Sequence, residues 1–209
     1  MSEIIADKNS ETIKPNDILI TLCDSVSFVM STATGCEIKY APMVQRITRT
    51  TLRPDIGTFV LFTGSFSGMV VINFSKEAAM EIYTGYMTTM GLPEQELTKN
   101  YASDEVANSL GELMNQILGN FTSKVSANLH SRIEQSQPKM LALPHEVQVS
   151  INMALDNPQA SRITFKTGSG NVFYLEYTMD DTEFIPVGEL SEHEEIDPDD
   201  ILASVFNEK

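Results

Sequence analysis

The chain has 209 residues, enough for one domain with tails, and 42% of them are apolar, which is enough for a hydrophobic core. Its formal net charge of −15 at pH 7 argues against nucleic acid and anionic membrane surfaces, because both require a positive protein surface. No window approaches about 18 consecutive apolar residues, and the N-terminus is polar and acidic, so we expect a cytoplasmic protein without membrane insertion.

Cysteine and histidine are too sparse to suggest a disulfide framework or a metal centre. Of the two cysteines, Cys23 and Cys36, the first lies in a helical pattern and is predicted to be a small buried apolar residue. The histidines are far apart and lack the spacing of zinc ligands, so no metal site is predicted: they are His130, His145 and His193.

The order of the elements predicts one α+β domain over residues 16–186, with a flexible arm at 1–15 and an acidic tail at 187–209. Strands follow one another in runs, and so do helices, with little strand-by-helix alternation. This segregation favours an antiparallel sheet covered by long helices. In chain order the predicted elements are a helix at 16–34, strands at 44–52, 58–63 and 69–74, helices at 76–90 and 103–129, and strands at 147–155, 163–167 and 172–179.

Two glycine-rich loops are predicted to be hairpin turns, at 64–68 and 168–171. The first loop does not match a nucleophile elbow, in which a serine lies midway between the glycines and a helix follows. Here the middle residue is Phe66 and a strand follows, which also argues against a phosphate-binding loop.

The longest uninterrupted helical pattern covers residues 103–129. Ser103 suits the N-cap, and the acidic Asp104 and Glu105 suit the positive end of the helix dipole. Apolar residues recur at spacings of three and four, which places them on one side of the helix: Val106, Leu110, Leu113, Ile117, Phe121 and Val125.

The opposite side of this helix carries polar and small residues: Asn108, Glu112, Asn115, Gly119, Thr122 and Ser126. Glu112 and Asn115 are three residues apart, so their side chains are neighbours on one face. The carboxylate can hold a cation, and the carboxamide can orient a water molecule by donating and accepting at once. By composition alone, a solvated helix face is the favoured interpretation.

Segment 112–120, ELMNQILGN, resembles the signature helix of the CheC/CheX/FliY family of chemotaxis phosphatases. That family has Asp or Ser, three residues, Glu, two residues, Asn, twenty-two residues and then Pro. Glu112, Asn115 and Pro138 match this pattern in register. A register that starts at Glu105 keeps the Glu-x-x-Asn spacing but loses the proline, so it is rejected. The resemblance covers residues 16–180, and the single motif is similar to the CheX type, which works as a homodimer.

The resemblance implies a CheC/CheX-like fold and dephosphorylation of the phospho-aspartate of a CheY-like response regulator. In that interpretation Asn115 orients the attacking water and Glu112 pairs with the regulator's active-site lysine. Asn108 and Gly119 would contact the partner. The protein would have no cofactor of its own, because the Mg²⁺ belongs to the regulator.

One position departs from the family pattern, because Asn108 occupies the place of Asp or Ser and supplies no carboxylate. The alternative function is therefore a catalytically inactive scaffold of the same fold that binds a response regulator in chemotaxis or flagellar signalling.

The tail contains a short amphipathic pattern after an acidic run. Asp197 and Pro198 are helix-start signals, and two apolar pairs follow at a spacing of four, Ile201 with Val205 and Leu202 with Phe206. This segment resembles the short acidic helix with which flagellar switch proteins hold phosphorylated CheY. Docking in a partner's groove and docking on its own domain both remain open.

Overall fold

The three helices predicted from the sequence are present in the computed structural model, which describes residues 12–185. They are α1 (Pro15–Thr34), α2 (Lys76–Thr89) and α3 (Asp104–Leu129), and a short 3₁₀ helix, η1 (Glu94–Glu96), lies between α2 and α3. The strands are β1 (Lys39–Tyr40), β2 (Gln45–Ile47), β3 (Thr50–Leu52), β4 (Ile56–Gly64), β5 (Gly68–Phe74), β6 (Ile133–Gln135), β7 (Lys139–Ala142), β8 (Val149–Ile151), β9 (Pro158–Lys166) and β10 (Val172–Asp180).

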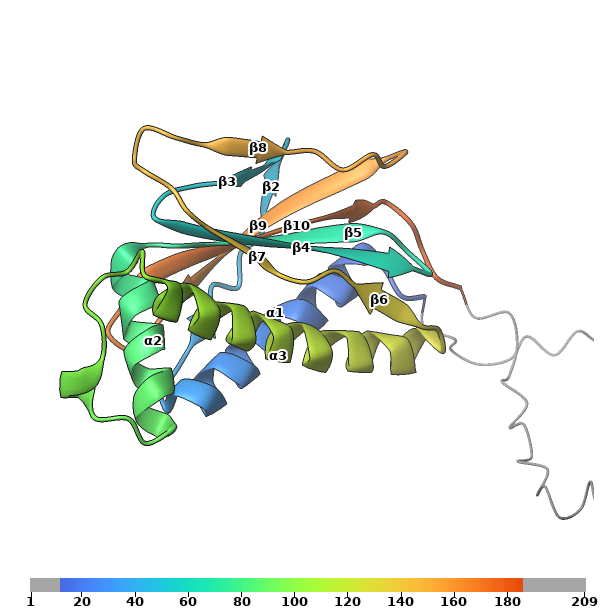
Figure 1. Ribbon diagram of the computed structural model, residues 1–209. Coiled ribbons are helices and arrows are strands. Elements are labelled where there is room, and N and C mark those ends of the chain that lie inside the picture. Colours follow the sequence, from blue (N-terminus) through green and yellow to red (C-terminus); the bar gives the residue numbers. More distant parts are fainter. Residues whose placement is uncertain (1–11, 186–209) are drawn as a thin grey trace, which may run out of the picture. The chain divides into compact units, whose positions relative to one another are not determined.

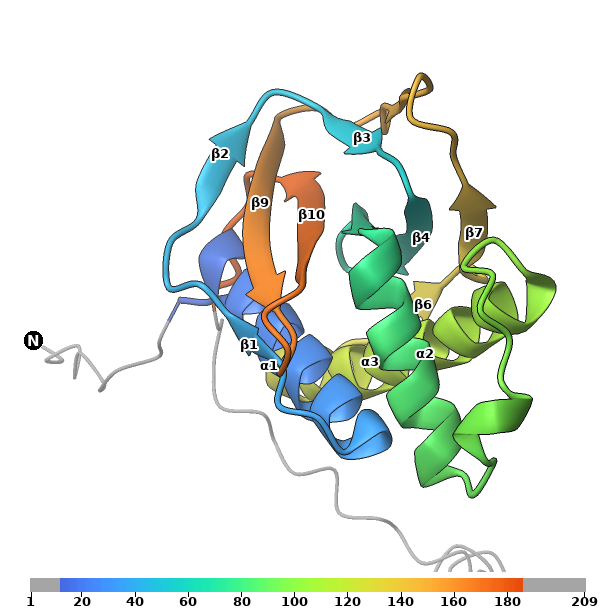
Figure 2. The same cartoon turned by 90° about the vertical axis from the view of Figure 1, so that its left-hand side faces the viewer.

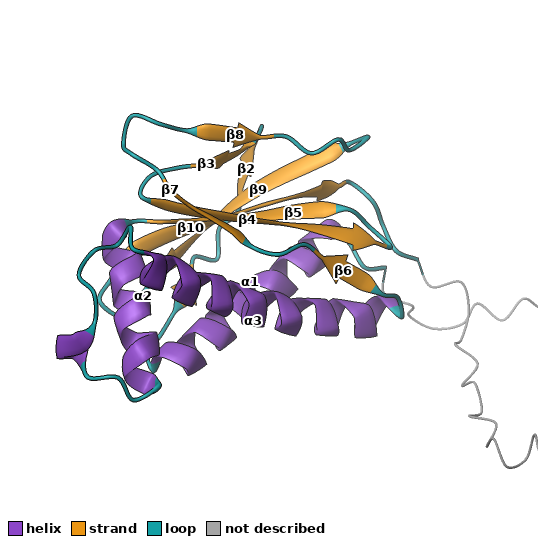
Figure 3. Cartoon of the chain, viewed as in Figure 1, coloured by secondary structure: helices purple, strands orange, loops and turns teal. Residues whose placement is uncertain are grey.

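Eight of these strands form one antiparallel sheet in the order β1-β9-β10-β5-β4-β6, with β2 also paired to β9 and β7 to β4. The three helices cover one face of this sheet, and a second, two-stranded sheet of β3 and β8 lies over the other face (Figures 1 and 3). All seven residues of β5 are buried, because it is central and covered on both faces. Figure 2 shows the strong curl of the sheet. The α+β class predicted from the sequence is confirmed.

Helix α1 lies in the core of the helical layer. Its end is set by Gly35, whose φ of 66° lies in the left-handed region that glycine adopts without strain. Its length and composition also satisfy the requirements of a membrane-spanning helix, but it packs against α3 and α2, as a core helix does. Cys23 is buried on this helix as predicted, and burial, reinforced by neighbouring Asp24, raises the pKa of its thiol to about 12.

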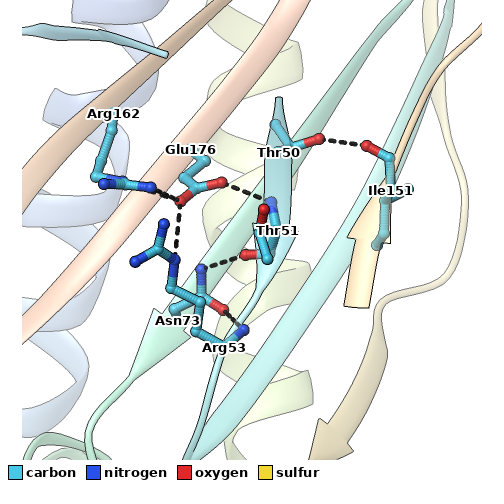
Figure 4. A network of polar contacts seen from close by, with 7 residues as sticks. All are labelled: Thr50, Thr51, Arg53, Asn73, Ile151, Arg162 and Glu176. Atoms are coloured by element: carbon cyan, nitrogen blue, oxygen red, sulfur yellow. Dashed lines mark hydrogen bonds and ion pairs between the residues drawn. The ribbon is translucent and has the colours of Figure 1, made fainter. Parts of the chain in front are cut away.

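The small sheet is attached to the large one by buried side chains. A cluster of Leu52, Met69, Val71 and Leu143 fills the space between them. Strand β3 does not pair with any strand of the large sheet. Instead, side chains of the large sheet make hydrogen bonds to the backbone N–H and carbonyl of Thr51 (Figure 4). The N–H of Thr51 donates to Glu176 Oε2 at 2.8 Å, and its carbonyl accepts from Asn73 Nδ2 at 2.9 Å.

Glu176 is completely buried and is held by an arginine of the neighbouring strand. Arg162 donates to Glu176 Oε1 from Nε at 2.9 Å and from Nη2 at 2.7 Å. A buried carboxylate requires such charged partners, because removal from water disfavours its ionised form. The network therefore joins β9, β10 and β3.

Several short strands differ from the sequence predictions. The single strand predicted at 44–52 is wrong, because β2 and β3 belong to different sheets and are separated by the exposed Thr48 and Arg49. β1, β6 and β7 lie in segments for which no strand was predicted. β8 is shorter than the strand predicted at 147–155, whereas β9 begins at Pro158, five residues before the predicted start at 163. Apart from β9, these strands have only two to four residues, too few to show the alternation that indicates a strand.

Replacing Glu176 with alanine removes the carboxylate partner of Arg162, whose side chain is only 16% exposed, and leaves the Thr51 N–H without its acceptor. We expect the free energy of unfolding in urea to fall by about 3 kcal/mol. Glu176→Gln keeps an acceptor for Thr51 and should lose less. Unchanged stability of Glu176→Ala would contradict the role given to this network.

Candidate functional site

The position of α3 is set by its apolar side. Ser103 caps the helix by accepting the N–H of Val106 at 3.4 Å, as the sequence predicted. The six apolar residues predicted to face inward are all buried, at 2% exposure or less: Val106, Leu110, Leu113, Ile117, Phe121 and Val125. Phe121 contacts Phe62 of β4, with ring centroids 5.3 Å apart, and so ties the middle of the helix to the sheet.

The opposite side of α3 faces outward. Asn108, Glu112, Asn115 and Gly119 are all exposed. At about 100° per residue these four positions fall within about 60° of one another around the helix axis. The predicted polar side is therefore a narrow, solvent-accessible stripe along the helix.

Part of this stripe lines an open hollow of about 430 Å³ between α3 and the segment that leads into β7. Its walls contain Ala107, Asn108, Gly111, Glu112 and Asn115 of α3, with Gln137, Pro138 and Met140 opposite them. Strand β7 is held in place by antiparallel pairing with β4, with Met140 opposite Thr58. Pro138 immediately precedes this strand. Proline has no backbone N–H, and at this position the pairing of β7 with β4 does not require one.

The structure thus brings together Glu112, Asn115, Asn108 and Pro138, which the sequence places up to thirty residues apart. Gly119 lies one turn further along α3 and does not line the hollow. Gln137 and Met140 also line it but were not singled out in the sequence, where no pattern distinguishes them. The predicted tail contacts lie outside the described residues: Ile201, Leu202, Val205 and Phe206.

The functional groups in the hollow have few internal partners. The Glu112 carboxylate accepts one long hydrogen bond, 3.4 Å, from Gln116 Nε2 on the next turn. Within residues 12–185, no Lys or Arg lies at ion-pair distance from Glu112, and the side chains of Asn108 and Asn115 make no hydrogen bond. An unpaired carboxylate and a free carboxamide beside it can receive a cation and a water molecule from outside.

The stripe contains residues that the helix itself does not favour. Glycine inside a helix costs about 1 kcal/mol relative to alanine, and asparagine costs part of that. A Cβ atom built at Gly119 would meet nothing within 4 Å, so no packing in this structure demands glycine there. Residues that weaken a helix without an internal reason are expected where a partner must approach closely.

The residues described by the structure do not hold a ready metal centre. Among positions 12–185, no three His, Cys, Asp or Glu side chains come together as a metal site requires. Glu112 is the only carboxylate among the residues that line the hollow.

Residues 9–209 match a family model with the description "Protein of unknown function (DUF3334)". The chain belongs to this family. No curated protein has a significantly similar sequence.

Several solved structures with the same fold are described as chemotaxis proteins or as CheC-like proteins. CheX from Desulfovibrio desulfuricans has a TM-score of 0.65 at 16% identity, covering 78% of this chain and 99% of that chain. A CheC-like superfamily protein from Shewanella sp. PV-4 has a TM-score of 0.64 at 18% identity, covering 78% and 97%. A CheX–CheY–BeF3–Mg²⁺ complex from Borrelia burgdorferi matches with a TM-score of 0.56 at 15% identity, covering 78% and 98%. The predicted CheC/CheX-like fold is confirmed.

Substituting alanine at the stripe should not weaken the fold. We expect Gly119→Ala to raise the free energy of unfolding by about 1 kcal/mol and Asn115→Ala by up to about 0.5 kcal/mol, because alanine is the better helix former. The buried neighbour Leu113→Ala serves as the matched control and should lose about 2–5 kcal/mol. Urea denaturation of the three variants measures this, and a loss at Gly119 would show that the position is packed.

Proposed function

We propose that this protein dephosphorylates the phospho-aspartate of a CheY-like response regulator in the cytoplasm, within chemotaxis or flagellar signalling. The observation that carries the proposal is the hollow in which Glu112 and Asn115 of α3 face Pro138, on a fold like that of CheX. A structural relative that was solved as a CheX–CheY–BeF3–Mg²⁺ complex supports a regulator of the CheY type as the partner.

In the proposed reaction the exposed stripe of α3 lies over the active site of the regulator. The carboxamide of Asn115 enters that site and holds a water molecule in line with the phosphorus, donating one hydrogen bond and accepting another. The water oxygen attacks phosphorus, the bond from phosphorus to the aspartate oxygen breaks, and inorganic phosphate leaves. Phosphoryl transfer depends mainly on positioning and charge stabilisation, so a neutral amide is sufficient for this role.

Glu112 supplies the charge that orients the partner. Its carboxylate is exposed and has no cationic partner within residues 12–185, so it is available for the regulator's active-site lysine. The Mg²⁺ of the reaction is held by the regulator, because Glu112 is the only carboxylate lining the hollow. Gly119, one turn away, gives the partner backbone room to approach. By similarity to the CheX type, the active form is a homodimer.

A second function is favoured by one observation. Asn108 lines the hollow at the position where the related motif has Asp or Ser, and its amide carries no charge. A protein that binds the phosphorylated regulator without hydrolysing it would keep Glu112 as a docking charge. The two functions are distinguished by turnover.

We expect the wild-type protein to accelerate phosphate release from a response regulator of the same organism phosphorylated with acetyl phosphate. Asn115→Ala should slow the release about 100-fold, because it removes a group that positions the water. Glu112→Ala should mainly weaken binding of the regulator. Asn128→Ala, an exposed asparagine of the same helix far from the hollow, is the matched control and should behave like the wild type.

The outcomes separate the two functions. Tight binding of phosphorylated regulators without accelerated release would leave only the scaffold. Equal effects of Asn115→Ala and Asn128→Ala on release would contradict the assignment of Asn115. Absence of both binding and release across all regulators of the organism would overturn both functions.

The sequence of the tail adds a tether to this proposal. The amphipathic segment with Ile201, Leu202, Val205 and Phe206 would hold the regulator and raise its effective concentration at the hollow. Deleting residues 189–209 should then weaken binding of the regulator at least tenfold, as measured by fluorescence anisotropy, while the release rate at saturating regulator stays unchanged. Unchanged affinity would contradict the tether.

A further inference from the structure

A second hollow, lined by arginines, lies on the face of the sheet opposite the helices. The chain has five arginines, Arg46, Arg49, Arg53, Arg132 and Arg162, and all of them except Arg132 line this one hollow of about 530 Å³. Its other walls carry hydroxyl, amide and aliphatic groups: Gln45, Ile47, Thr48, Thr51, Gln148 and Ser150. No acidic residue lines it, although the chain has a net charge of −15.

The arginines are gathered by the way the strands pair. Arg46 lies in β2, which pairs with β9 so that Gln45 is opposite Arg162. The break after β2 places Arg49 between the two sheets, and Arg53 follows the end of β3. Arginines separated by more than one hundred residues in the sequence thus surround a single space, which shares no lining residue with the hollow beside α3.

Within residues 12–185, one carboxylate lies at ion-pair distance from these arginines. Glu176, fully buried beneath the hollow, accepts both hydrogen bonds from Arg162, and the Nε of Arg53 is 3.8 Å from the same oxygen (Figure 4). That Nε atom is itself buried and has no hydrogen-bond acceptor.

The remaining two guanidinium groups have no carboxylate partner within residues 12–185. Arg46 donates to the neutral Gln159, and Arg49 is exposed without any partner there. Arg46 also lines a neighbouring hollow with Asp181 and Glu183, so the unbalanced positive charge of the arginine hollow comes mainly from Arg49 and Arg53.

The geometry favours phosphate as the complementary anion. Guanidinium groups present planar pairs of N–H donors that match phosphate oxygens, and charge-assisted hydrogen bonds of this kind are the strong ones. Arg162 is already oriented by Glu176 and lies 6.0 Å from the centre of the Tyr174 ring, so binding does not have to order it. The volume is in the range of small-molecule sites.

We propose that this hollow binds a small molecule carrying at least two phosphate groups. Several guanidinium groups around one space match the several oxygens of a diphosphate group rather than those of a single carboxylate. The acidic surface of the rest of the chain disfavours a long nucleic-acid polyanion, which would extend beyond the hollow. The site is independent of the α3 hollow, so its test does not depend on the proposed phosphatase.

Isothermal titration calorimetry of the full chain with pyrophosphate and with ADP tests the proposal. Both should bind, orthophosphate should bind more weakly, and adenosine should not bind. Arg49→Gln and Arg53→Gln should each weaken pyrophosphate binding about tenfold or more, because each removes a charge-assisted hydrogen bond. Arg132→Gln is the matched control, since this fifth arginine is exposed and pairs with Glu134 away from the hollow.

Thermal melts by circular dichroism establish that each variant is folded before its affinity is compared. The proposal is overturned if neither pyrophosphate nor ADP binds at millimolar concentration, or if Arg132→Gln weakens binding as much as Arg49→Gln does. It is also overturned if Arg49→Gln changes the molecular mass by light scattering, because the hollow would then be a contact between copies of the chain.

Discussion

Burial of the apolar side of α3 is the constraint on which the candidate site depends. The helix is pinned at its middle by Phe121 against Phe62, two rings without any solvent exposure. A helix has one orientation that buries such a stripe, so the residues opposite must face outward. The outward position of Glu112 and Asn115 is therefore set by side chains that take no part in the proposed chemistry. Because tertiary packing holds the helix, its outer stripe tolerates asparagine and glycine, which a helix in isolation would not favour.

The other face of the sheet is organised by a buried charge. Glu176 and Asn73 bind the backbone of Thr51 on the edge of β3 that does not pair with β8. Buried polar groups need partners, and the backbone of Thr51 receives them from side chains of β5 and β10. The same arrangement fixes Arg162 and brings Arg53 close to Glu176. Because the buried Glu176 carboxylate needs cationic partners, arginines gather around it and form a positive region on an otherwise acidic protein. The helical face and this face are thus chemically distinct.

In or beside each hollow lie residues that do not increase the stability of the fold. Asn115 and Gly119 weaken the helix without an internal compensation, and Arg49 carries a charge without a partner in the described chain. Natural proteins retain such residues where function opposes stability. The two hollows are lined by different residues, so a ligand in one need not compete with a ligand in the other.

The sequence by itself determined the three helices, the cap at Ser103, the two hairpins and the face shared by Glu112 and Asn115. These features follow from periodicity and turn chemistry, which are local properties of the chain. The resemblance also named Pro138, but only the pairing of β7 with β4 places it beside α3.

Tertiary structure alone decided the change of sheet between β2 and β3, the short strands β1, β6 and β7, and the gathering of the arginines. Strand partners are chosen by packing between distant segments, and exposed edge strands leave no hydrophobic alternation in the sequence. For that reason the face of α3 could be predicted from the sequence, whereas the arginine hollow could be found only in the folded protein.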